Sequence, residues 1–368
     1  MTMPRWADLV LIPFLNLFLA LVISGIVLLY IGENPIEALT IMVRGAVGST
    51  YGWGYTLFYA TNFIFTGLAV AIAFHARLFN IGGEGQAQLG ALGVALVCLY
   101  LPLGHWVIAL PVAILGAALF GAAWAAIPAY LQATRGSHIV ITTIMFNLIA
   151  SALMVYLLAD TALKMPGMAP ESAGFPESTH LPDARAVFGA LGITFARTPL
   201  NVAFLFALLC CFLVWVLIWR TRLGYEIRAF GHSEPAAVYA GISPFKITMT
   251  TMLISGALAG CMAINAVMGE QERLLQENVG GAGFVGIAVA LMGRSHPFGV
   301  LLAAILFGAL YQGGAELEFE TSVPTDMIVV IQALVILFTG ALGNMVRDPV
   351  GKLFLRYKRA PKPGVPAE

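Results

Sequence analysis

The sequence is poor in charge. Only 10% of its 368 residues are Asp, Glu, Lys or Arg, and 60% are hydrophobic, whereas an ordinary soluble domain has roughly 25% charged residues. A soluble core does not need this much apolar surface, but burial in lipid does, because a helix of about 20 apolar residues crosses the hydrocarbon layer. The 19 basic and 19 acidic residues balance, so no polyanionic partner is indicated. The composition predicts an all-α polytopic membrane protein.

Motifs for enzymatic chemistry are also missing. GxxxxGK[ST] does not occur, since the only Gly-Lys pair, Gly351-Lys352, lacks the upstream glycine and is followed by Leu353. The chain therefore has no P-loop with which to hydrolyse ATP. HExxH and GxSxG are absent too, and we expect no catalytic residue and no metal site. The few cysteines fall inside apolar runs, where they are expected to be small core residues rather than disulfide or zinc ligands. They are Cys98, Cys210, Cys211 and Cys261.

Long apolar runs are what the sequence does have. Their number predicts about ten transmembrane helices. The runs cover residues 9–31, 57–76, 85–101, 106–131, 139–158, 200–219, 246–268, 279–292, 297–315 and 326–346. The first run is too long for a signal peptide and no small-x-small cleavage site follows it, so it is expected to be an uncleaved span.

The basic residues predict the orientation of these spans. With the N-terminus in the cytoplasm, 14 of the 19 lysines and arginines fall on the cytoplasmic side, as the positive-inside rule requires. Both termini are then cytoplasmic. We expect a single transmembrane domain over residues 1–346, with an external loop at 159–199 and a cytoplasmic loop at 220–243. A basic cytoplasmic tail follows at 347–368.

A polar, glycine-rich segment at residues 78–86 interrupts the spans. Asn80, Glu84 and Gln86 lie around Gly82 and Gly83, and glycines disfavour a continuous helix by about 1 kcal/mol each. Two interpretations remain open. The segment is either a tight cytoplasmic turn with a solvated Glu84, or a broken helix whose polar groups line a cavity, the setting in which irregular backbone is tolerated at membrane depth.

The central cytoplasmic loop contains signals for a separate short helix. Ser233 is a good N-cap, Pro235 suits a first turn, and Gly241 is a stop signal. Ser243 and Pro244 start the next span in the same way. Short loops between spans rarely carry a capped helix, so this pattern favours a docking helix for a soluble partner over an ordinary connection.

A third segment, residues 278–297, is a short glycine-rich span. One interpretation is a span that close packing allows to be short. The other is the second half of a solute pathway whose first half is the segment near Asn80. The second interpretation is suggested because the two glycine-rich segments fall in similar positions of two weakly related halves of the chain. Gly256 and Gly260 form a GxxxG pattern in the preceding span, which indicates helix packing.

These segments together resemble the branched-chain amino acid and simple-sugar class of ABC importer permeases, within which the nucleoside and simple-sugar branch is closest. The resemblance extends over about residues 9–346. It rests on four motifs: LFNIGGEGQ at 78–86, GSH at 136–138 leading to IMFN at 144–147, GYEIRAFG at 224–231 with AGI at 240–242, and GFVGIAVALMGR at 283–294. The chain departs from the family at Arg77, where a glycine is common.

The resemblance implies a type II-like importer permease in the bacterial inner membrane, which forms the translocation path for nucleosides or simple sugars. Its expected partners are a second permease, identical or different, two ATPase subunits that bind ATP and Mg, and a periplasmic or lipid-anchored binding protein. No cofactor is expected in this chain. The residues carried over as the substrate path are Asn80, Gly82, Gly83, Glu84, Gln86 and Asn147, and those of the ATPase-coupling loop are Glu226, Arg228, Gly231, Glu234, Ala240 and Gly241.

The alternative function is an autonomous secondary transporter of a small polar solute. Such a protein needs ionisable residues inside the membrane to carry a coupling ion. Glu84 is the only strong interior candidate in the apolar runs, so the sequence favours the ABC permease.

Overall fold

The computed structural model describes residues 11–338, apart from 162, 190, 191, 193, 322 and 324. Within these residues the chain is helical, and the only β pairing is three isolated bridges. The chain divides into two compact units, Val43–Gly313 and a second unit made of Met1–Met42 and Gly314–Glu368. The all-α prediction is confirmed for the described part of the chain.

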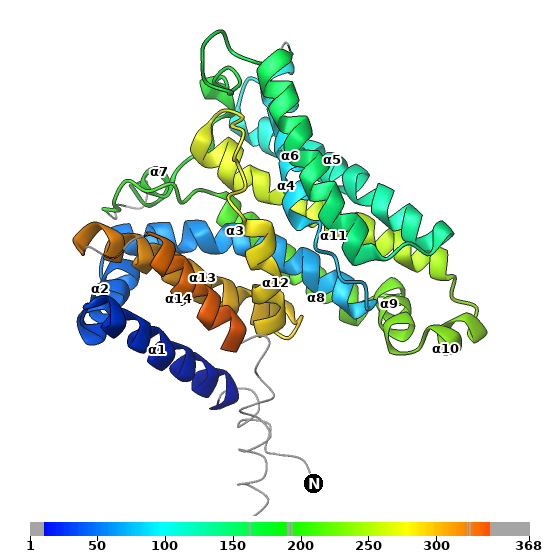
Figure 1. Ribbon diagram of the computed structural model, residues 1–368. Coiled ribbons are helices and arrows are strands. Elements are labelled where there is room, and N and C mark those ends of the chain that lie inside the picture. Colours follow the sequence, from blue (N-terminus) through cyan, green and yellow to red (C-terminus); the bar gives the residue numbers. More distant parts are fainter. Residues whose placement is uncertain are drawn as a thin grey trace, which may run out of the picture. The chain divides into compact units, whose positions relative to one another are not determined.

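The helices follow one another along the whole described chain (Figure 1). The first half contains α1 (Ile12–Ile31), α2 (Pro35–Val47), α3 (Thr50–His75), α4 (Gly83–Tyr100), α5 (Trp106–Arg135), α6 (Ile139–Asp160), the 3₁₀ turn η2 (Glu177–Thr179) and α7 (Ala184–Gly189). The second half contains α8 (Ala203–Arg220), α9 (Arg222–His232), α10 (Glu234–Tyr239), α11 (Pro244–Ala263), the π-helix η3 (Ile264–Gln271), α12 (Ala282–Met292), α13 (Pro297–Glu320) and α14 (Thr325–Ile336).

Each of the ten predicted spans coincides with a helix, but the count of ten transmembrane spans is not established. Six helices of the described chain are long and apolar enough to cross a membrane, namely α3, α5, α6, α8, α11 continued by η3, and α13. A seventh span results if the bent pair Phe14–Tyr30 and Pro35–Val47 counts as one. The last predicted span, 326–346, is described only as far as residue 338, and the tail at 347–368 lies outside the described residues.

Small residues bring α4, α5 and α11 into close contact in the larger unit (Figure 1). A Cβ atom added to Gly256 of α11 would overlap the carbonyl of Gly121 in α5, and one added to Gly260 would overlap the carbonyl of Ala117. Gly90 of α4 meets the backbone of Gly260 in the same way. Since such backbone approach needs small residues, the predicted packing role of Gly256 and Gly260 is confirmed.

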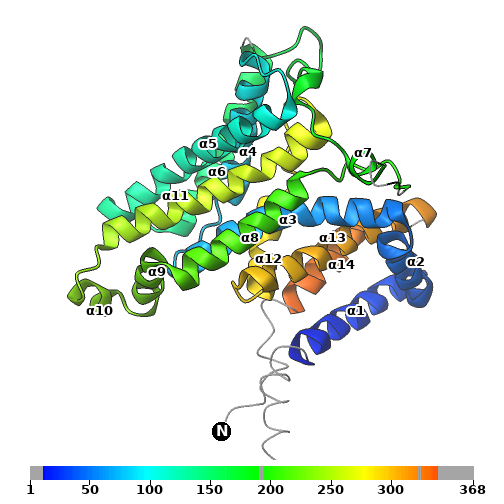
Figure 2. The same ribbon diagram turned by 180° about the vertical axis from the view of Figure 1, so that it is seen from behind.

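The separate short helix predicted after Ser233 is present at one end of this unit. Figure 2 shows α8 and α11 converging there on the short helices α9 and α10. Ser233 caps α10 by accepting a hydrogen bond from the backbone N–H of Ala236, and Gly241 has the left-handed φ of +80° that stops it. Ser243 caps α11 at Lys246 N–H. Helix α9, which begins after the Thr221 cap, was not predicted.

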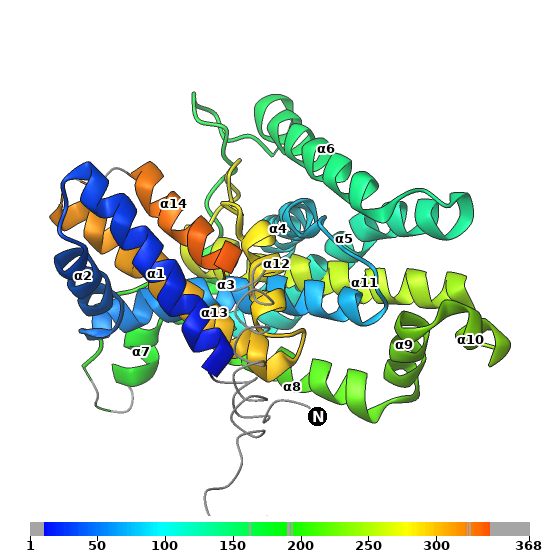
Figure 3. The ribbon, with the colours of Figure 1, turned by 60° about the horizontal axis from the view of Figure 1, so that its bottom comes forward.

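Helix α12 has only 11 residues and packs along α3 and against α4, as Figure 3 shows. Gly286 touches Thr66 of α3, and Gly67 of α3 faces Val289. The glycines thus allow α12 and α3 to approach closely. This is what we expect if residues 278–297 are a span shortened by close packing.

Candidate functional site around the start of α12

The turn between α3 and α4 is tight and mostly buried, although Arg77 is exposed. Arg77 ends α3 with φ of +56°, a left-handed conformation that glycine adopts without strain. This explains physically why glycine suits the position that Arg77 occupies. Leu78 N–H then returns to the carbonyl of Ala73, 3.0 Å away, and closes the turn.

Asn80 is the centre of this turn and is fully buried. Its Oδ1 accepts from Gly82 N–H at 2.9 Å and from Gln86 Nε2 at 3.1 Å. Its Nδ2 donates to Gln86 Oε1 at 2.9 Å and to Ser255 Oγ of α11 at 2.8 Å. Ser255 Oγ in turn donates to the carbonyl of Ala69 in α3. Asn80 therefore joins α4, α11 and, through Ser255, α3.

Asn147 brings α6 into the same cluster. Its Oδ1 accepts from Gly85 N–H at 2.9 Å, and its Nδ2 donates to the carbonyl of Ile81 at 3.0 Å. These two bonds satisfy backbone groups at the irregular start of α4, where the helix leaves its first N–H groups unpaired.

Glu84 connects the start of α4 with the start of α12. The residue is only 9% exposed. Oε1 accepts from Gly281 N–H and Oε2 from Gly283 N–H, both at 2.9 Å. A carboxylate at a helix N-terminus satisfies unpaired N–H groups and interacts favourably with the helix dipole. The contact needs close backbones, since a Cβ at Gly283 would overlap the backbone of Glu84.

The predicted path residues thus lie together in one hydrogen-bonded cluster. Glu84 is not solvated, so the interpretation of the segment as a turn with an exposed carboxylate is wrong. In the conformation described, the amides of Asn80, Gln86 and Asn147 bond to one another, to Ser255 or to the protein backbone. Their contribution to a solute path stays a prediction. Gly82 belongs to the same turn, and a Cβ there would contact Gln86 and Asn80.

A second buried amide cluster was not predicted. Asn265, at the start of η3, donates from Nδ2 to Asn62 Oδ1 of α3 at 2.8 Å and to the carbonyl of Phe58 at 3.0 Å. Asn201, before α8, donates to Asn265 Oδ1 at 3.1 Å. The signal available in the sequence was a polar residue inside an apolar run, which faces a protein interior by default.

The residues of the predicted coupling loop differ in exposure. On α9, Glu226 and Arg228 are half-buried and Gly231 is buried, whereas the residues on and after α10 are exposed. Glu226 pairs with Arg222 one turn earlier, at 3.0 Å. On α10, Val238 and Tyr239 are exposed, Tyr239 by 96%, whereas Ala237 is buried. Glu234 and Ala240 are exposed as well.

Gly231 of α9 joins the coupling loop to the end of α3. A Cβ at Gly231 would overlap the carbonyl oxygen of His75. The ring of His75 donates from Nε2 to the carbonyl of Ser295, just beyond α12, at 3.0 Å. A cavity of about 300 Å³ lies beside this contact and is lined by the α3–α4 turn, the end of α5, Phe230 and Glu234.

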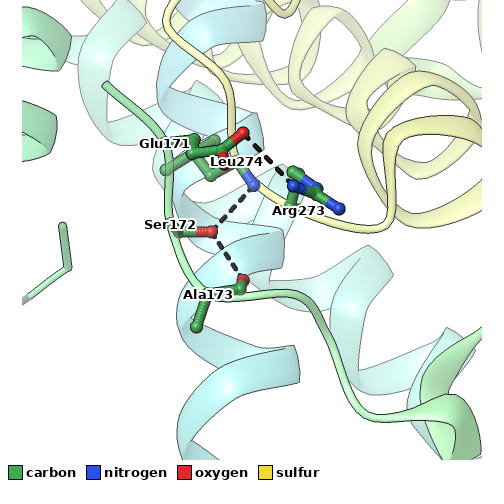
Figure 4. A network of polar contacts seen from close by, with 5 residues as sticks. All are labelled: Glu171, Ser172, Ala173, Arg273 and Leu274. Atoms are coloured by element: carbon green, nitrogen blue, oxygen red, sulfur yellow. Dashed lines mark hydrogen bonds and ion pairs between the residues drawn. The ribbon is translucent and has the colours of Figure 1, made fainter. Parts of the chain in front are cut away.

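The loop that follows α6 is fixed to the segment that follows η3 (Figure 4). Ser172 Oγ accepts from Leu274 N–H at 2.9 Å, and Ser172 N–H donates to the carbonyl of Leu274 at 3.0 Å. Arg273 and Glu171 form an ion pair of 3.3 Å beside it. The loop at 159–199 is therefore anchored to the connection that leads into α12.

Comparison with known proteins gives relatives of nearly full length. The family model described as "Branched-chain amino acid transport system / permease component" matches residues 53–340. The Glucose ABC transporter permease protein TsgB13 of Haloferax volcanii is 34% identical and covers 96% of this chain and 93% of its own length. The Guanosine ABC transporter permease protein NupP of Bacillus subtilis is 35% identical, with coverage of 93% and 96%.

A third relative, the Nucleoside ABC transporter permease protein NupB of Lactococcus lactis, is 31% identical and covers 89% of this chain and 90% of its own. The resemblance inferred from the four motifs is confirmed by these matches. The chain belongs to the family of branched-chain amino acid transport system permeases, the multi-pass membrane subunits of ABC importers.

Proposed function

We propose that this chain forms the translocation path of an ABC importer for nucleosides or simple sugars, and that a separate subunit binds ATP and Mg and hydrolyses the nucleotide. The observation that carries the proposal is similarity of 31–35% identity, over about nine tenths of the chain or more, to permeases named for guanosine, nucleosides and glucose. A second permease and an external binding protein complete the importer.

The topology of the proposal has ten spans and both termini in the cytoplasm. The bias of 14 basic residues to one side supports this orientation, and a helix at each predicted span supports the count. Residues 1–346 then form one transmembrane domain with its external loop at 159–199 and its coupling loop at 220–243. Residues 347–368 form a cytoplasmic tail.

The ATPase docks on α10 in this proposal. Exposed Val238 and Tyr239 on a separately capped helix provide an apolar anchor, and aromatic anchors dominate the energy of many interfaces. Arg228 and Glu226 on α9 supply the neighbouring charges. Movement of α9 is transmitted to the end of α3 at Gly231, because the backbone of Gly231 lies directly on the carbonyl of His75.

Solute moves by alternating access around the cluster of Asn80, Glu84, Gln86 and Asn147. A partner can bias the permease only through contacts that differ between its two states. Docking that shifts α9 acts on α12 through His75 and Ser295, while Glu84 holds the other end of α12. The start of α12 and the turn at Gly82 and Gly83 are thereby placed to open or close the path.

Reconstitution of the importer tests the function. The permease, its partner permease, the ATPase and the binding protein are placed in proteoliposomes, and uptake of radiolabelled guanosine and glucose is measured. We expect uptake that needs internal ATP and survives a protonophore. Uptake driven by an ion gradient without ATP would establish the secondary transporter instead.

The docking surface is tested with Tyr239→Ala and Val238→Ala in the same vesicles. We expect each to lower solute-stimulated ATPase activity and co-purification of the ATPase, because a buried aromatic anchor is worth about 2 kcal/mol or more. Leu119→Ala on α5, also an exposed apolar residue, is the matched control. Full ATPase coupling in Tyr239→Ala, or in Arg228→Glu, would contradict the assignment.

A further inference from the structure

A row of aromatic side chains follows one face of α3 and continues on α13. Tyr51, Tyr55 and Tyr59 recur every four residues, which places them on the same side of the helix. Their ring centroids are 4.8 Å apart from Tyr51 to Tyr55 and 6.4 Å apart from Tyr55 to Tyr59. Tyr311 of α13 continues the row, 5.7 Å from Tyr59, and Phe63 lies 5.0 Å beyond it. All five rings belong to the larger unit.

The row is held in place by the packing of α13 on α3. Gly308, one turn before Tyr311, touches the carbonyl of Thr56, so that a Cβ there would overlap it. Thr56 itself donates its hydroxyl to the carbonyl of Ala46 at 2.9 Å. The aromatic row is therefore a fixed arrangement of neighbouring helices rather than a set of independent surface residues.

Two ordinary explanations do not account for this row. Tyrosines of a membrane-interface belt lie at one depth, but Tyr51 to Tyr59 covers about 12 Å of helix at 1.5 Å per residue. Core aromatics are fully buried, as Phe63 is, whereas Tyr51 is 46% exposed and Tyr55, Tyr59 and Tyr311 are half-buried. The row thus presents ring surface that other parts of the chain leave accessible over most of its length.

The row ends close to α12. Phe63 lies three residues before Thr66 of α3, and Thr66 touches Gly286 in α12. The π-helix η3 is bonded to α3 next to Tyr59, because Asn265 Nδ2 donates to the carbonyl of Phe58. Glu270 in the last turn of η3 is an exposed carboxylate. The row therefore combines flat apolar faces, phenol hydroxyls and a carboxylate.

This combination matches one of the two solute classes better than the other. A nucleobase has two flat faces that stack on aromatic rings, and its ribose hydroxyls donate to carboxylates. A sugar is bound mainly through many hydrogen bonds, but the amides of Asn80, Gln86 and Asn147 already bond to the protein. The accessible groups of the row are mainly rings.

We propose that Tyr51, Tyr55, Tyr59 and Tyr311 form a stacking track along which the heterocyclic base of a nucleoside moves towards Glu84, with Glu270 receiving the ribose hydroxyls. This inference rests on the proposed function, because it narrows the solute of the importer from nucleosides or sugars to nucleosides.

The test uses the complete importer in proteoliposomes, with radiolabelled adenosine, guanosine and glucose as probes. Tyr55→Leu and Tyr59→Leu keep an apolar side chain but remove the ring, whereas Tyr55→Phe and Tyr59→Phe keep the ring and remove the hydroxyl. Tyr100→Leu, an exposed tyrosine at the end of α4, is the matched control.

We expect each leucine variant to lower Vmax/KM for nucleoside uptake by about 5-fold or more, the lower end of what loss of one base–aromatic stack costs in affinity. The phenylalanine variants and Tyr100→Leu remain within about twofold, because stacking does not need the hydroxyl. Nucleoside uptake that is unchanged in both leucine variants overturns the track but leaves the proposed function intact.

Glucose uptake without nucleoside uptake also overturns the track and keeps the ABC importer. If neither solute is taken up in an ATP-dependent manner, the proposed function itself is wrong. If the leucine variants fail to assemble, the track is tested by photolabelling the unaltered importer with 8-azidoadenosine. Label in the peptide that contains residues 51–63 supports the track, and label confined to other peptides overturns it.

Discussion

Glu84 is the residue whose replacement tests the geometry most directly. Its two carboxylate oxygens accept hydrogen bonds from Gly281 and Gly283, each 2.9 Å long. Hydrogen bonds to a charged group contribute about 1.5–3 kcal/mol each. Glu84→Ala removes both acceptors and leaves two N–H groups at the buried start of α12 unpaired, so we expect a loss of about 3–6 kcal/mol in the free energy of unfolding.

Glu84→Gln gives an intermediate result. The amide keeps one oxygen for one of the two N–H groups but presents its own NH₂ group to the other, and two donors cannot pair. We expect roughly half the loss of Glu84→Ala, about 1.5–3 kcal/mol. Glu84→Asp keeps the charge but is one methylene shorter, so that its two oxygens do not reach both N–H groups from the same backbone.

The measurement is denaturant-induced unfolding of the purified permease in mild detergent, followed by the fluorescence of its tryptophans. Glu277→Gln is the matched control, because this exposed carboxylate lies in the loop just before α12, and surface replacements stay within about 0.5 kcal/mol. If Glu84→Ala unfolded at the same denaturant concentration as Glu277→Gln, Glu84 would not cap α12 and the reasoning would fail.

Three further replacements test neighbouring contacts in the same unfolding assay. Gly283→Ala places a methyl group against the start of α4 and is expected to lower the free energy of unfolding by about 1–3 kcal/mol. Its control is Gly189→Ala at an open position of α7, where we expect no loss of stability. Arg77→Gly relieves a left-handed φ of +56° and is expected to raise stability by about 0.5–1 kcal/mol; a lower stability would contradict the strain. Ser172→Ala removes the acceptor of Leu274 N–H, and we expect a loss of about 1–3 kcal/mol and faster proteolysis of the loop at 159–199, so an unchanged cleavage rate would argue against the anchor.

Local signals predicted those parts of the fold that depend on a few consecutive residues. The caps at Ser233 and Ser243 and the stop at Gly241 are where the sequence places them, because capping involves residues only three positions apart. Helix α9 was missed although it carries the same kind of signal. Thr221 accepts from Gly224 N–H at 3.1 Å, in the position of an N-cap.

The contacts of the candidate site could not be predicted in this way. Glu84 and Gly283 are 199 positions apart, and neither residue carries a local signal for the other. The sequence identified a polar, glycine-rich turn and a glycine-rich short helix, but hydropathy cannot tell that one caps the other. The π-helical continuation of α11 at η3 could not be predicted either, because its apolar pattern is that of an ordinary transmembrane span. The hydrogen-bond partners of Asn265 are also distant in sequence, since they lie on α3 and just before α8.

Helix α12 is held at both of its ends by hydrogen bonds to other helices. Glu84 fixes the N-terminus to the irregular turn of α4, and the segment just after its C-terminus is bonded through Ser295 to His75, whose own carbonyl lies under Gly231 of α9. Packed interiors transmit displacement rather than absorb it. A shift of α9 therefore displaces the end of α3 or of α12, and a displaced α12 strains the two bonds of Glu84. A short helix suits this arrangement, because with only 11 residues its two ends lie about 17 Å apart. One rigid body can then join the proposed docking surface to the turn at Asn80.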